Sequence, residues 1–314
     1  MKVALIGLGH LGKIHFKCLK ETDFELVGIY DPKFSGVYEG TACYNEVGKL
    51  ISEVDACIIA AATSAHQNLT EQALSQGKHC FVEKPLASTL EETHKLVQLA
   101  SKFPELITQV GFVERYNPAF QFLENEIRDP KFIEVHRLAQ FNNRGIDVSV
   151  VHDLMIHDLD LLLTMKKSKI REVKANGVKV FTDTLDICNS RIEFDDGSVA
   201  NITASRMSMK VMRKFRIFQD NCYLSMDLQK KESQIIKLSN EQLQDSMQFS
   251  IHNQDKFIQF KSSGVLEGNA IAAELNDFYS CIQNGIQTRA SFENVLHTSR
   301  LAHEIETIAN NSLN

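Results

Sequence analysis

The chain opens with Lys2-Val3-Ala4-Leu5-Ile6-Gly7-Leu8-Gly9-His10-Leu11-Gly12, an apolar run that leads into three closely spaced glycines. Residues 2–6 are typical of a buried strand, and residues 13–19 have the spacing of a helix. Strand, Gly-x-Gly-x-x-Gly and helix in this order indicate a dinucleotide-binding unit. The glycines permit a tight turn, close approach of a pyrophosphate and close helix packing, and the helix start faces the phosphates. We therefore expect residues 7–12 to bind a dinucleotide.

An acidic residue stands where such a unit needs one. Asp31 ends the next apolar run, residues 24–30, and follows Gly12 by 19 positions. A carboxylate there accepts hydrogen bonds from the adenosine ribose and repels a 2′-phosphate. No arginine follows directly, although Lys33 is close, so the pattern favours NAD over NADP. The alternative is an ordinary Asp-Pro turn.

The second landmark is His79-Cys80-Phe81-Val82-Glu83-Lys84-Pro85. It begins as a strand and ends at a proline, which cannot continue a central strand. Lys84 would then project from the carboxyl end of a parallel strand, the edge where open sheets bind ligands. We expect Glu83 and Lys84 to lie between a cofactor and a substrate. The alternative is a solvated charge pair before a turn.

The order of elements predicts two domains of different class. Strand patterns alternate with helix patterns up to residue 112, which indicates a doubly wound parallel sheet, that is, an α/β Rossmann domain over residues 1–118. Several strand patterns between residues 132 and 227 then indicate an α+β domain over residues 119–314 with a large, mostly antiparallel sheet. Helices return near residues 270–283 and 292–309, and packing of these last helices on the first domain is left open.

Composition excludes several classes of protein. Hydrophobic residues make up 43% and charged residues 24% of the chain, and its net charge of -6 argues against a nucleic-acid partner. No apolar run approaches the roughly 20 residues of a membrane span, and the N-terminus lacks a signal-peptide layout. The seven cysteines show no C-x-x-C spacing. We expect a cytoplasmic protein without a metal site, a membrane partner or disulfides.

A third landmark lies at residues 151–165, which we predict to be a helix. Asp153, His157 and Asp160 are spaced i, i+4, i+7, so they share one face. Burying such a face is costly unless it is used. It is a solvent-facing polar stripe, a metal site of Asp153 and His157, or an acid/base pair in which Asp153 orients the His157 imidazole. We favour the acid/base pair, because histidine moves protons near neutral pH.

Together these motifs resemble the glucose-fructose oxidoreductase / inositol dehydrogenase / rhizopine-catabolism (Gfo/Idh/MocA) oxidoreductases. The resemblance covers nearly the whole chain. It rests on Gly7 to Gly12, Asp31, His66, Gly77-Lys78-His79, Glu83-Lys84-Pro85 and the Asp153/His157/Asp160 signature. It implies an NAD-dependent dehydrogenase with catalytic Lys84, His157 and Asp153. It implies further cofactor contacts from Ala61, Thr63, His66, Glu83 and Lys84. Where the family usually has Thr-Pro before the equivalent of His66, this chain has Ala61-Ala62.

Within that family the chain is similar to the UDP-N-acetylglucosamine 3-dehydrogenases. The similarity lies in residues 111–118, 143–147, 150–160, 203–206 and 212–214. It implies a UDP-N-acetylhexosamine substrate bound by Asp153, His157, Arg115, Asn117, Arg144 and Arg206, since arginine forks match a diphosphate. For most of the basic residues near 206–216, the alternative is that they are solvated charges on strands. His152 stands where the subgroup usually has an apolar residue.

Several functions stay open beside that one. The substrate is alternatively inositol or a free sugar, or the chain uses NAD to cleave a glycoside through a 3-keto sugar. An NAD-binding regulator without turnover would need neither Lys84 nor His157, so their presence favours an enzyme.

We also expect a homodimer or homotetramer, since the family commonly assembles through the second domain's sheet. Helices cover one face of such a sheet, and we expect Ile202, Ile217 and Phe218 on the other face. A large exposed apolar sheet face usually marks an interface.

Overall fold

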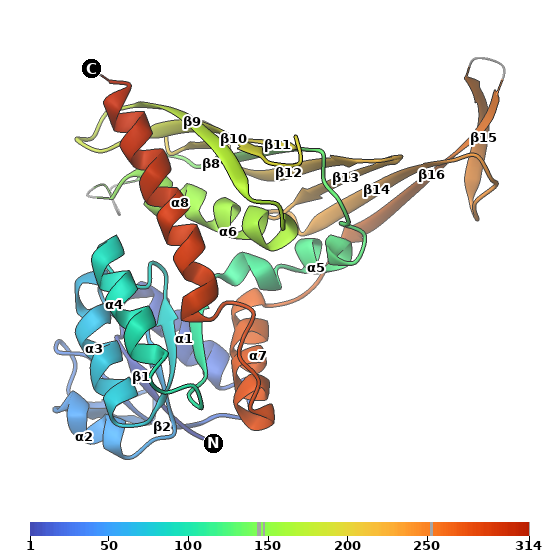
Figure 1. Ribbon diagram of the computed structural model, residues 1–314. Coiled ribbons are helices and arrows are strands. Elements are labelled where there is room, and N and C mark those ends of the chain that lie inside the picture. The colour runs from blue at the N-terminus through green and yellow to red at the C-terminus, as the bar shows by residue number, and fades with distance from the viewer. Residues whose placement is uncertain (143–145, 147, 252–253, 314) are drawn as a thin grey trace. The chain divides into compact units, whose positions relative to one another are not determined.

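The computed structural model describes residues 1–142, 146, 148–251 and 254–313 (Figure 1). The chain forms two compact units, Met1–Tyr116 with Asn269–Arg300 and Asn117–Gly268 with Leu301–Asn314. The unit boundary lies two residues before residue 118. Residues 269–300 belong with the first unit, whereas the division at residue 118 assigned them to the second.

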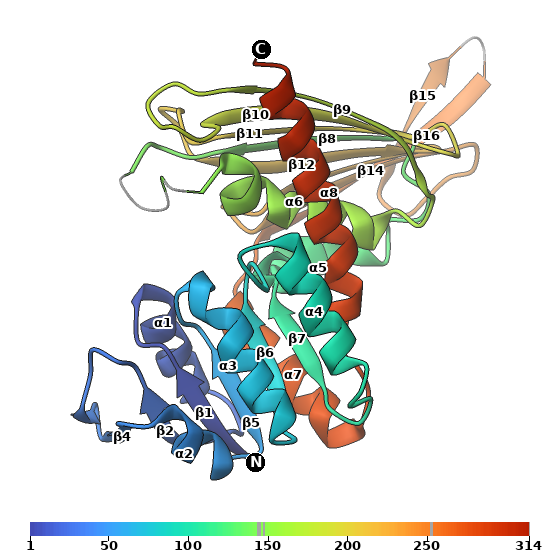
Figure 2. The same cartoon turned by 60° about the vertical axis from the view of Figure 1, so that its left-hand side comes forward.

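The first unit is built on a seven-stranded sheet of order β3-β4-β2-β1-β5-β6-β7, parallel except for β3 against β4. Helices α3 and α4 lie on one face of this sheet and α7 on the other (Figure 2). The strands are β1 Lys2–Ile6, β2 Glu25–Tyr30, β3 Gly36–Tyr38, β4 Thr41–Tyr44, β5 Ala56–Ile59, β6 His79–Glu83 and β7 Thr108–Gly111. The helices are α1 His10–Leu19, α2 Val47–Ser52, α3 Thr63–Ser75, α4 Leu90–Ala100 and α7 Ala270–Asn284, with a 3₁₀ turn η1 at Val113–Tyr116.

Burial on both faces explains why these short apolar runs become parallel strands. All four residues of β5 are buried, as are the last four of β1. Helix α4 begins where the sequence places a cap: the Thr89 hydroxyl accepts from the Glu92 amide at 3.1 Å, and the Glu92 carboxylate accepts from the Thr89 amide. This reciprocal pair satisfies amides that the first helical turn leaves open. The predicted Rossmann-like parallel sheet is confirmed.

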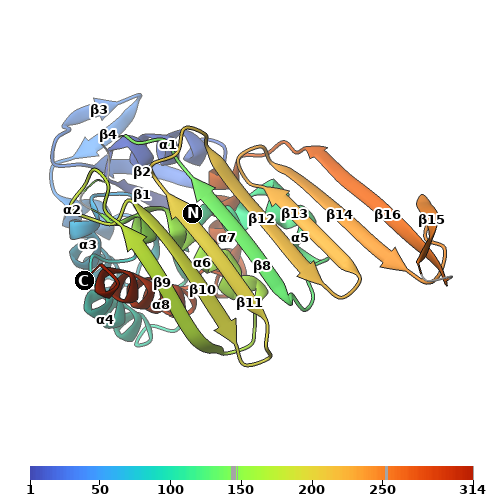
Figure 3. The same cartoon turned by 90° about the horizontal axis from the view of Figure 1, so that it is seen from above.

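The second unit is built on a nine-stranded sheet of order β15-β16-β14-β13-β12-β8-β11-β10-β9, seen face-on in Figure 3. Among the strands that the structure describes here, only β8 and β11 pair in parallel, so the predicted mostly antiparallel sheet is confirmed. The strands are β8 Phe132–Leu138, β9 Ile170–Val178, β10 Ile187–Phe194, β11 Val199–Ser205, β12 Met212–Gln219, β13 Cys222–Asp227, β14 Glu232–Ser239, β15 Ser246–Ile251 and β16 Gln254–Val265. Strands β14, β15 and β16 were not predicted, because their many Ser, Gln and Lys residues blur the apolar alternation that signals a strand.

Helical segments accompany this sheet. They are α5 Pro118–Glu124, a π-helical turn η2 Val151–Met155, α6 Ile156–Met165 and α8 Phe292–Asn311, whose last part lies in this unit. The predicted single helix from residue 151 is therefore a π-helical turn followed by an α-helix. No helix in the described part of the chain is both long and apolar enough to cross a membrane.

One expectation about this sheet is wrong. Ile202 and Ile217 are fully buried, whereas Phe218 is 39% exposed. Side chains alternate between the two faces of a strand, so Ile217 and Phe218 cannot share a face. The face opposite the core carries instead an aromatic row of Phe132, Phe218 and Tyr223, with ring centroids 5.9 and 5.0 Å apart.

A buried ion pair joins this sheet to α6. The Arg137 guanidinium on β8 donates to both carboxylate oxygens of Asp158 on α6, at 2.7 to 2.9 Å. The two side chains are 3% and 1% exposed. Taking two charges out of water is costly, so good geometry has to compensate. A fork-shaped cation against a carboxylate supplies that geometry.

We expect Arg137→Met to lower the free energy of unfolding by about 3–5 kcal/mol, because it leaves the Asp158 charge buried without its guanidinium. Urea titration measures this. Arg171→Met is the control, since Arg171 is 55% exposed and a surface ion pair such as Arg171–Glu193 contributes little to stability. Arg137→Met/Asp158→Leu should recover part of the loss. Equal effects of Arg137→Met and Arg171→Met would contradict this account.

Candidate functional site

The glycine loop after β1 has no room for side chains at two positions. Gly7 has φ +102°, and a Cβ there would lie 2.5 Å from the Ala60 carbonyl oxygen. A Cβ on Gly12 would lie 2.1 Å from the Gly7 carbonyl oxygen. A Cβ on Gly9 would meet nothing within 4 Å, and this exposed residue is the N-cap of α1. The backbone is therefore open where the helix begins, which fits a pyrophosphate. His10 and Leu11, also exposed, form the first turn of α1.

Asp31 lies at the carboxyl end of β2, next to this loop. Its Oδ2 accepts from the Leu8 amide at 2.7 Å and its Oδ1 from the Lys33 amide at 2.9 Å. A cavity of about 330 Å³ adjoins it, lined by Tyr30, Asp31, Pro32, Lys33, Phe34, Ser35, Tyr44 and Asn45. Aromatic and polar groups around one carboxylate suit the adenosine part of a dinucleotide. The residues of the loop and of this cavity thus fit NAD.

His66 ties the loop after β5 to the segment after β6. Its Nδ1 lies 2.9 Å from the Pro85 carbonyl oxygen and its Nε2 3.1 Å from the Ala61 carbonyl oxygen. Burial lowers the pKa of His66 and outweighs these two hydrogen bonds, so the ring is neutral near pH 7 and donates to one carbonyl at a time. Thr63 is the first residue of α3, beside Ala61. His66 therefore supports the backbone at Ala61 and Pro85.

Lys84 follows the last residue of β6, as expected, and is half-buried. The Glu83 carboxylate beside it accepts from the Lys84 amide at 3.1 Å and lies 2.6 Å from the His15 Nε2. Glu83 is therefore held inside the first unit. Lys84 itself lies at the carboxyl edge of the sheet.

Asp153 and His157 lie at the start of the helical segment in the second unit. Asp153 is in the π-helical turn, with its amide donating to the Ser149 carbonyl oxygen at 3.0 Å, and His157 is in the first turn of α6. Both are half-buried, whereas Asp158 and Asp160 are 1% exposed. The spacing did not predict the π-helical turn, a feature often found at functional sites.

A polar contact also joins this segment to α8. The His152 Nε2 lies 3.1 Å from Glu306 Oε2 on α8. The hydrogen bond from His152 lowers the pKa of Glu306. His152 therefore has a partner within the second unit that an apolar residue could not have.

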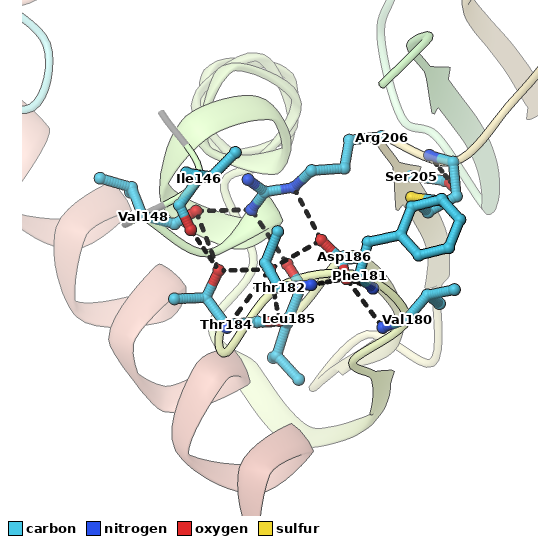
Figure 4. A network of polar contacts seen from close by, with 11 residues as sticks. Ile146, Val148, Val180, Phe181, Thr182, Thr184, Leu185, Asp186, Ser205 and Arg206 are labelled. Carbon is cyan, nitrogen blue, oxygen red and sulfur yellow. Dashed lines mark hydrogen bonds and ion pairs between the residues drawn. The ribbon is translucent and has the colours of Figure 1, made fainter. Parts of the chain in front are cut away.

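Arg206 is at the centre of a polar network (Figure 4). Its guanidinium donates to the carbonyl oxygens of Val148 and Leu185 and lies 3.5 Å from Asp186. Asp186 accepts from the amides of residues 180, 181 and 182, and these bonds lower its pKa to about 2 although burial alone would raise it. The Leu185 carbonyl also accepts from the Val150 amide at 2.9 Å. Arg206 thus holds the chain entering the Asp153/His157 segment.

The other expected substrate contacts are also tied to the backbone. Arg115, in the 3₁₀ turn, is 9% exposed and donates to the Arg289 carbonyl oxygen. Asn117, 5% exposed, caps α5 and donates to the Leu228 carbonyl oxygen at 3.0 Å. Arg144 lies outside the described residues. Direct substrate contact by Arg115, Asn117 or Arg206 therefore stays a prediction, while their observed bonds support the fold.

Sequence reasoning missed His15 and Arg137. His15 shares the buried face of α1 with Phe16 and Leu19, and only its polarity at a core position hinted at a role. Arg137 lies on the core face of β8 together with Ile133 and Val135. Within the described residues, no group of three or more His, Cys, Asp or Glu side chains could hold a metal ion.

Comparison with known proteins agrees with this geometry. Residues 1–112 match the model of the Gfo/Idh/MocA oxidoreductase family with an NAD-binding Rossmann fold. Residues 124–224 match the Gfo/Idh/MocA C-terminal domain. A UDP-N-acetylglucosamine 3-dehydrogenase from Acidithiobacillus ferrooxidans is 35% identical over 72% of this chain and 74% of its own. A solved structure of the enzyme so named from that organism has a TM-score of 0.88 at 28% identity, covering 100% of this chain and 98% of the other.

Inositol dehydrogenases are similar as well. The scyllo-inositol 2-dehydrogenase (NAD(+)) of Bacillus subtilis is 30% identical over 66% of this chain and 68% of its own length. The match to the inositol 2-dehydrogenase of Paracoccus denitrificans, 26% identical, spans only 53% of that protein. The first unit is thus an NAD-binding domain, and the chain belongs to the Gfo/Idh/MocA family of oxidoreductases.

Proposed function

We propose that this NAD-dependent dehydrogenase oxidises the C3 hydroxyl of a UDP-N-acetylhexosamine. The observation that carries the proposal is the likeness, through both units, to the Acidithiobacillus ferrooxidans enzyme whose name states that activity. It extends over 100% of this chain at a TM-score of 0.88. Retention of Lys84, Asp153 and His157 supports turnover, since a regulator would need none of them.

The proposed chemistry assigns one task to each side chain. NAD, when bound, accepts a hydride from the carbinol carbon. His157 takes the hydroxyl proton, and Asp153 orients its imidazole. Lys84 donates a hydrogen bond to the same oxygen and stabilises its developing negative charge. Glu83 holds the Lys84 backbone and does not react.

A second candidate is oxidation of inositol or another free polyol. The observation that favours it is the match to the Bacillus subtilis scyllo-inositol enzyme, 30% identical over two thirds of both chains. The same three side chains would perform that reaction, so only the substrate differs.

We further propose that the chain is cytoplasmic and forms a homodimer or homotetramer through the outer face of the nine-stranded sheet. The aromatic row of Phe132, Phe218 and Tyr223 supports the assembly, because an apolar row on an open sheet face is a common contact surface.

The substrate is tested by initial rates of NADH formation with UDP-N-acetylglucosamine, free N-acetylglucosamine and myo-inositol. We expect the nucleotide sugar to react fastest, because the diphosphate adds binding energy that free sugars lack, and UDP to compete with it. Faster oxidation of the free sugars, without competition by UDP, would reject the nucleotide sugar and leave the polyol.

For catalysis, we expect His157→Ala and Lys84→Ala each to lower kcat by about 10²–10⁴-fold, since each removes a group acting on the reacting oxygen. The Kd for NAD, from calorimetry, should change little for His157→Ala. His297→Ala and Lys95→Ala are matched controls at exposed helix positions and should keep the wild-type kcat. Near-normal turnover in either site variant would refute the assigned roles.

For cofactor choice, we expect the wild-type chain to bind NAD more tightly than NADP, because the Asp31 carboxylate repels a 2′-phosphate. Asp31→Ala should weaken NAD binding and reduce the preference. Asp31→Asn keeps an acceptor for the Leu8 amide, so it separates loss of charge from loss of loop structure. Calorimetry with both dinucleotides measures this, and tighter binding of NADP to the wild type would show the assignment to be wrong.

For assembly, we expect sedimentation at micromolar concentration to show an oligomer that Phe218→Lys dissociates. A charge in the aromatic row would have to be desolvated on association. Phe181→Lys is the control, since Phe181 is 71% exposed in the β9–β10 loop and its ring packs on Phe141 rather than on the aromatic row. A monomeric wild type would rule out the proposed assembly.

A further inference from the structure

His15 is a fully buried histidine on α1, three residues after Gly12. Its Nε2 lies 2.6 Å from Oε1 of Glu83, whose side chain is 10% exposed. A carboxylate shielded from water needs a hydrogen-bond partner to offset its lost hydration. The imidazole of His15 is that partner for one of the two Glu83 oxygens.

The other oxygen of the same carboxylate points to the Lys84 peptide. The Lys84 amide donates to Glu83 Oε2 at 3.1 Å. The Glu83 carboxylate thus connects the helix that begins at the glycine loop to the backbone from which the Lys84 side chain departs. Both contacts lie inside the first unit.

The carboxylate occupies the space that a side chain on the neighbouring strand would need. Gly111 of β7 pairs with Glu83, and a Cβ on Gly111 would lie 2.8 Å from Glu83 Oε2 and 2.9 Å from its Cδ. On the histidine side, the ring of Phe81 meets the imidazole edge-on, with centroids 5.4 Å apart. The carboxylate is therefore enclosed by α1, β6 and β7. Its position depends on the hydrogen bond to His15 on one side and on a residue without a side chain, Gly111, on the other.

We propose that His15 is a positioning residue for Lys84, acting through the Glu83 carboxylate. The helix that would carry the cofactor phosphates thereby also sets the place of the lysine. The inference rests on the proposed role of Lys84 at the reacting oxygen. A histidine that only filled core volume would be replaceable by leucine without effect on Lys84.

The test compares four variants. His15→Leu removes the ring nitrogen, and Gly111→Ala pushes the carboxylate from the opposite side. His15→Gln places an amide donor near the former Nε2. Phe16→Leu is the matched control: it reduces the next core residue of α1, whose ring packs on Tyr38. Displacing a reacting group by about 1 Å can cost about 10²-fold. We expect losses of kcat of that order in His15→Leu and Gly111→Ala, partial rescue in His15→Gln, and none in Phe16→Leu.

A second readout needs neither substrate nor NAD. Lysines of the NAD-free protein are dimethylated with ¹³C-formaldehyde and a borane reductant, which keeps their charge. The Lys84 resonance is assigned by its absence in Lys84→Met. We expect it to move in His15→Leu and Gly111→Ala and to stay in place in Phe16→Leu.

The outcomes separate the two proposals. Normal turnover of Lys84→Met would reject the role of Lys84 itself. If Lys84→Met is inactive while His15→Leu and Gly111→Ala both keep the wild-type kcat, the role of Lys84 stands and the inference about His15 is overturned. If His15→Leu does not fold, Gly111→Ala and His15→Gln still decide.

Discussion

Parallel pairing of the central strands is the constraint on which the cofactor edge depends. Ile6 at the end of β1 lies opposite Tyr30 of β2 and Ile59 of β5, and Ile59 lies opposite Val82 of β6. Parallel strands in this register end at one edge of the sheet. The residues that follow them therefore gather there: Gly7, Asp31, Ala61 and Lys84. Burial of both sheet faces by helices stabilises the pairing, since each strand removes two apolar faces from water.

Polar contacts hold the Asp153/His157 segment of the second unit in place. The Arg137–Asp158 pair anchors α6 to the sheet immediately beside His157. The His152–Glu306 contact and the Arg206 network hold the preceding turn and the chain that enters it. His157 stays half-buried between buried neighbours, Ile156 and Asp158. Such contacts have defined geometry, so they fix the position of this segment more closely than apolar packing alone would.

The basic residues show how tertiary structure decides between roles that residue type leaves open. A guanidinium suits a diphosphate, but it equally suits the carbonyl oxygens of loops. Arg115 and Arg206 both bond carbonyls, and Asn117 does the same while capping α5. Asp158, one residue after His157, pairs with the buried Arg137, and no sequence pattern predicted a role for it.

The sequence by itself determined the features that depend on local backbone chemistry. The roles of Gly7 and Gly12 could be predicted because no other residue fits their turn and close approach. The places of Asp31 and Lys84 could be predicted because each directly follows a strand. The alternation of strands and helices could also be predicted, because a strand buried on both faces is a continuous apolar run in the sequence.

Only the tertiary structure decided the rest. It assigned α7 to the first unit, added β14–β16 to the sheet and joined His15 to Glu83 across 68 positions. These outcomes depend on contacts between distant segments. The free energy of such a contact comes from how well two surfaces fit and exclude water, which no periodicity along one segment encodes.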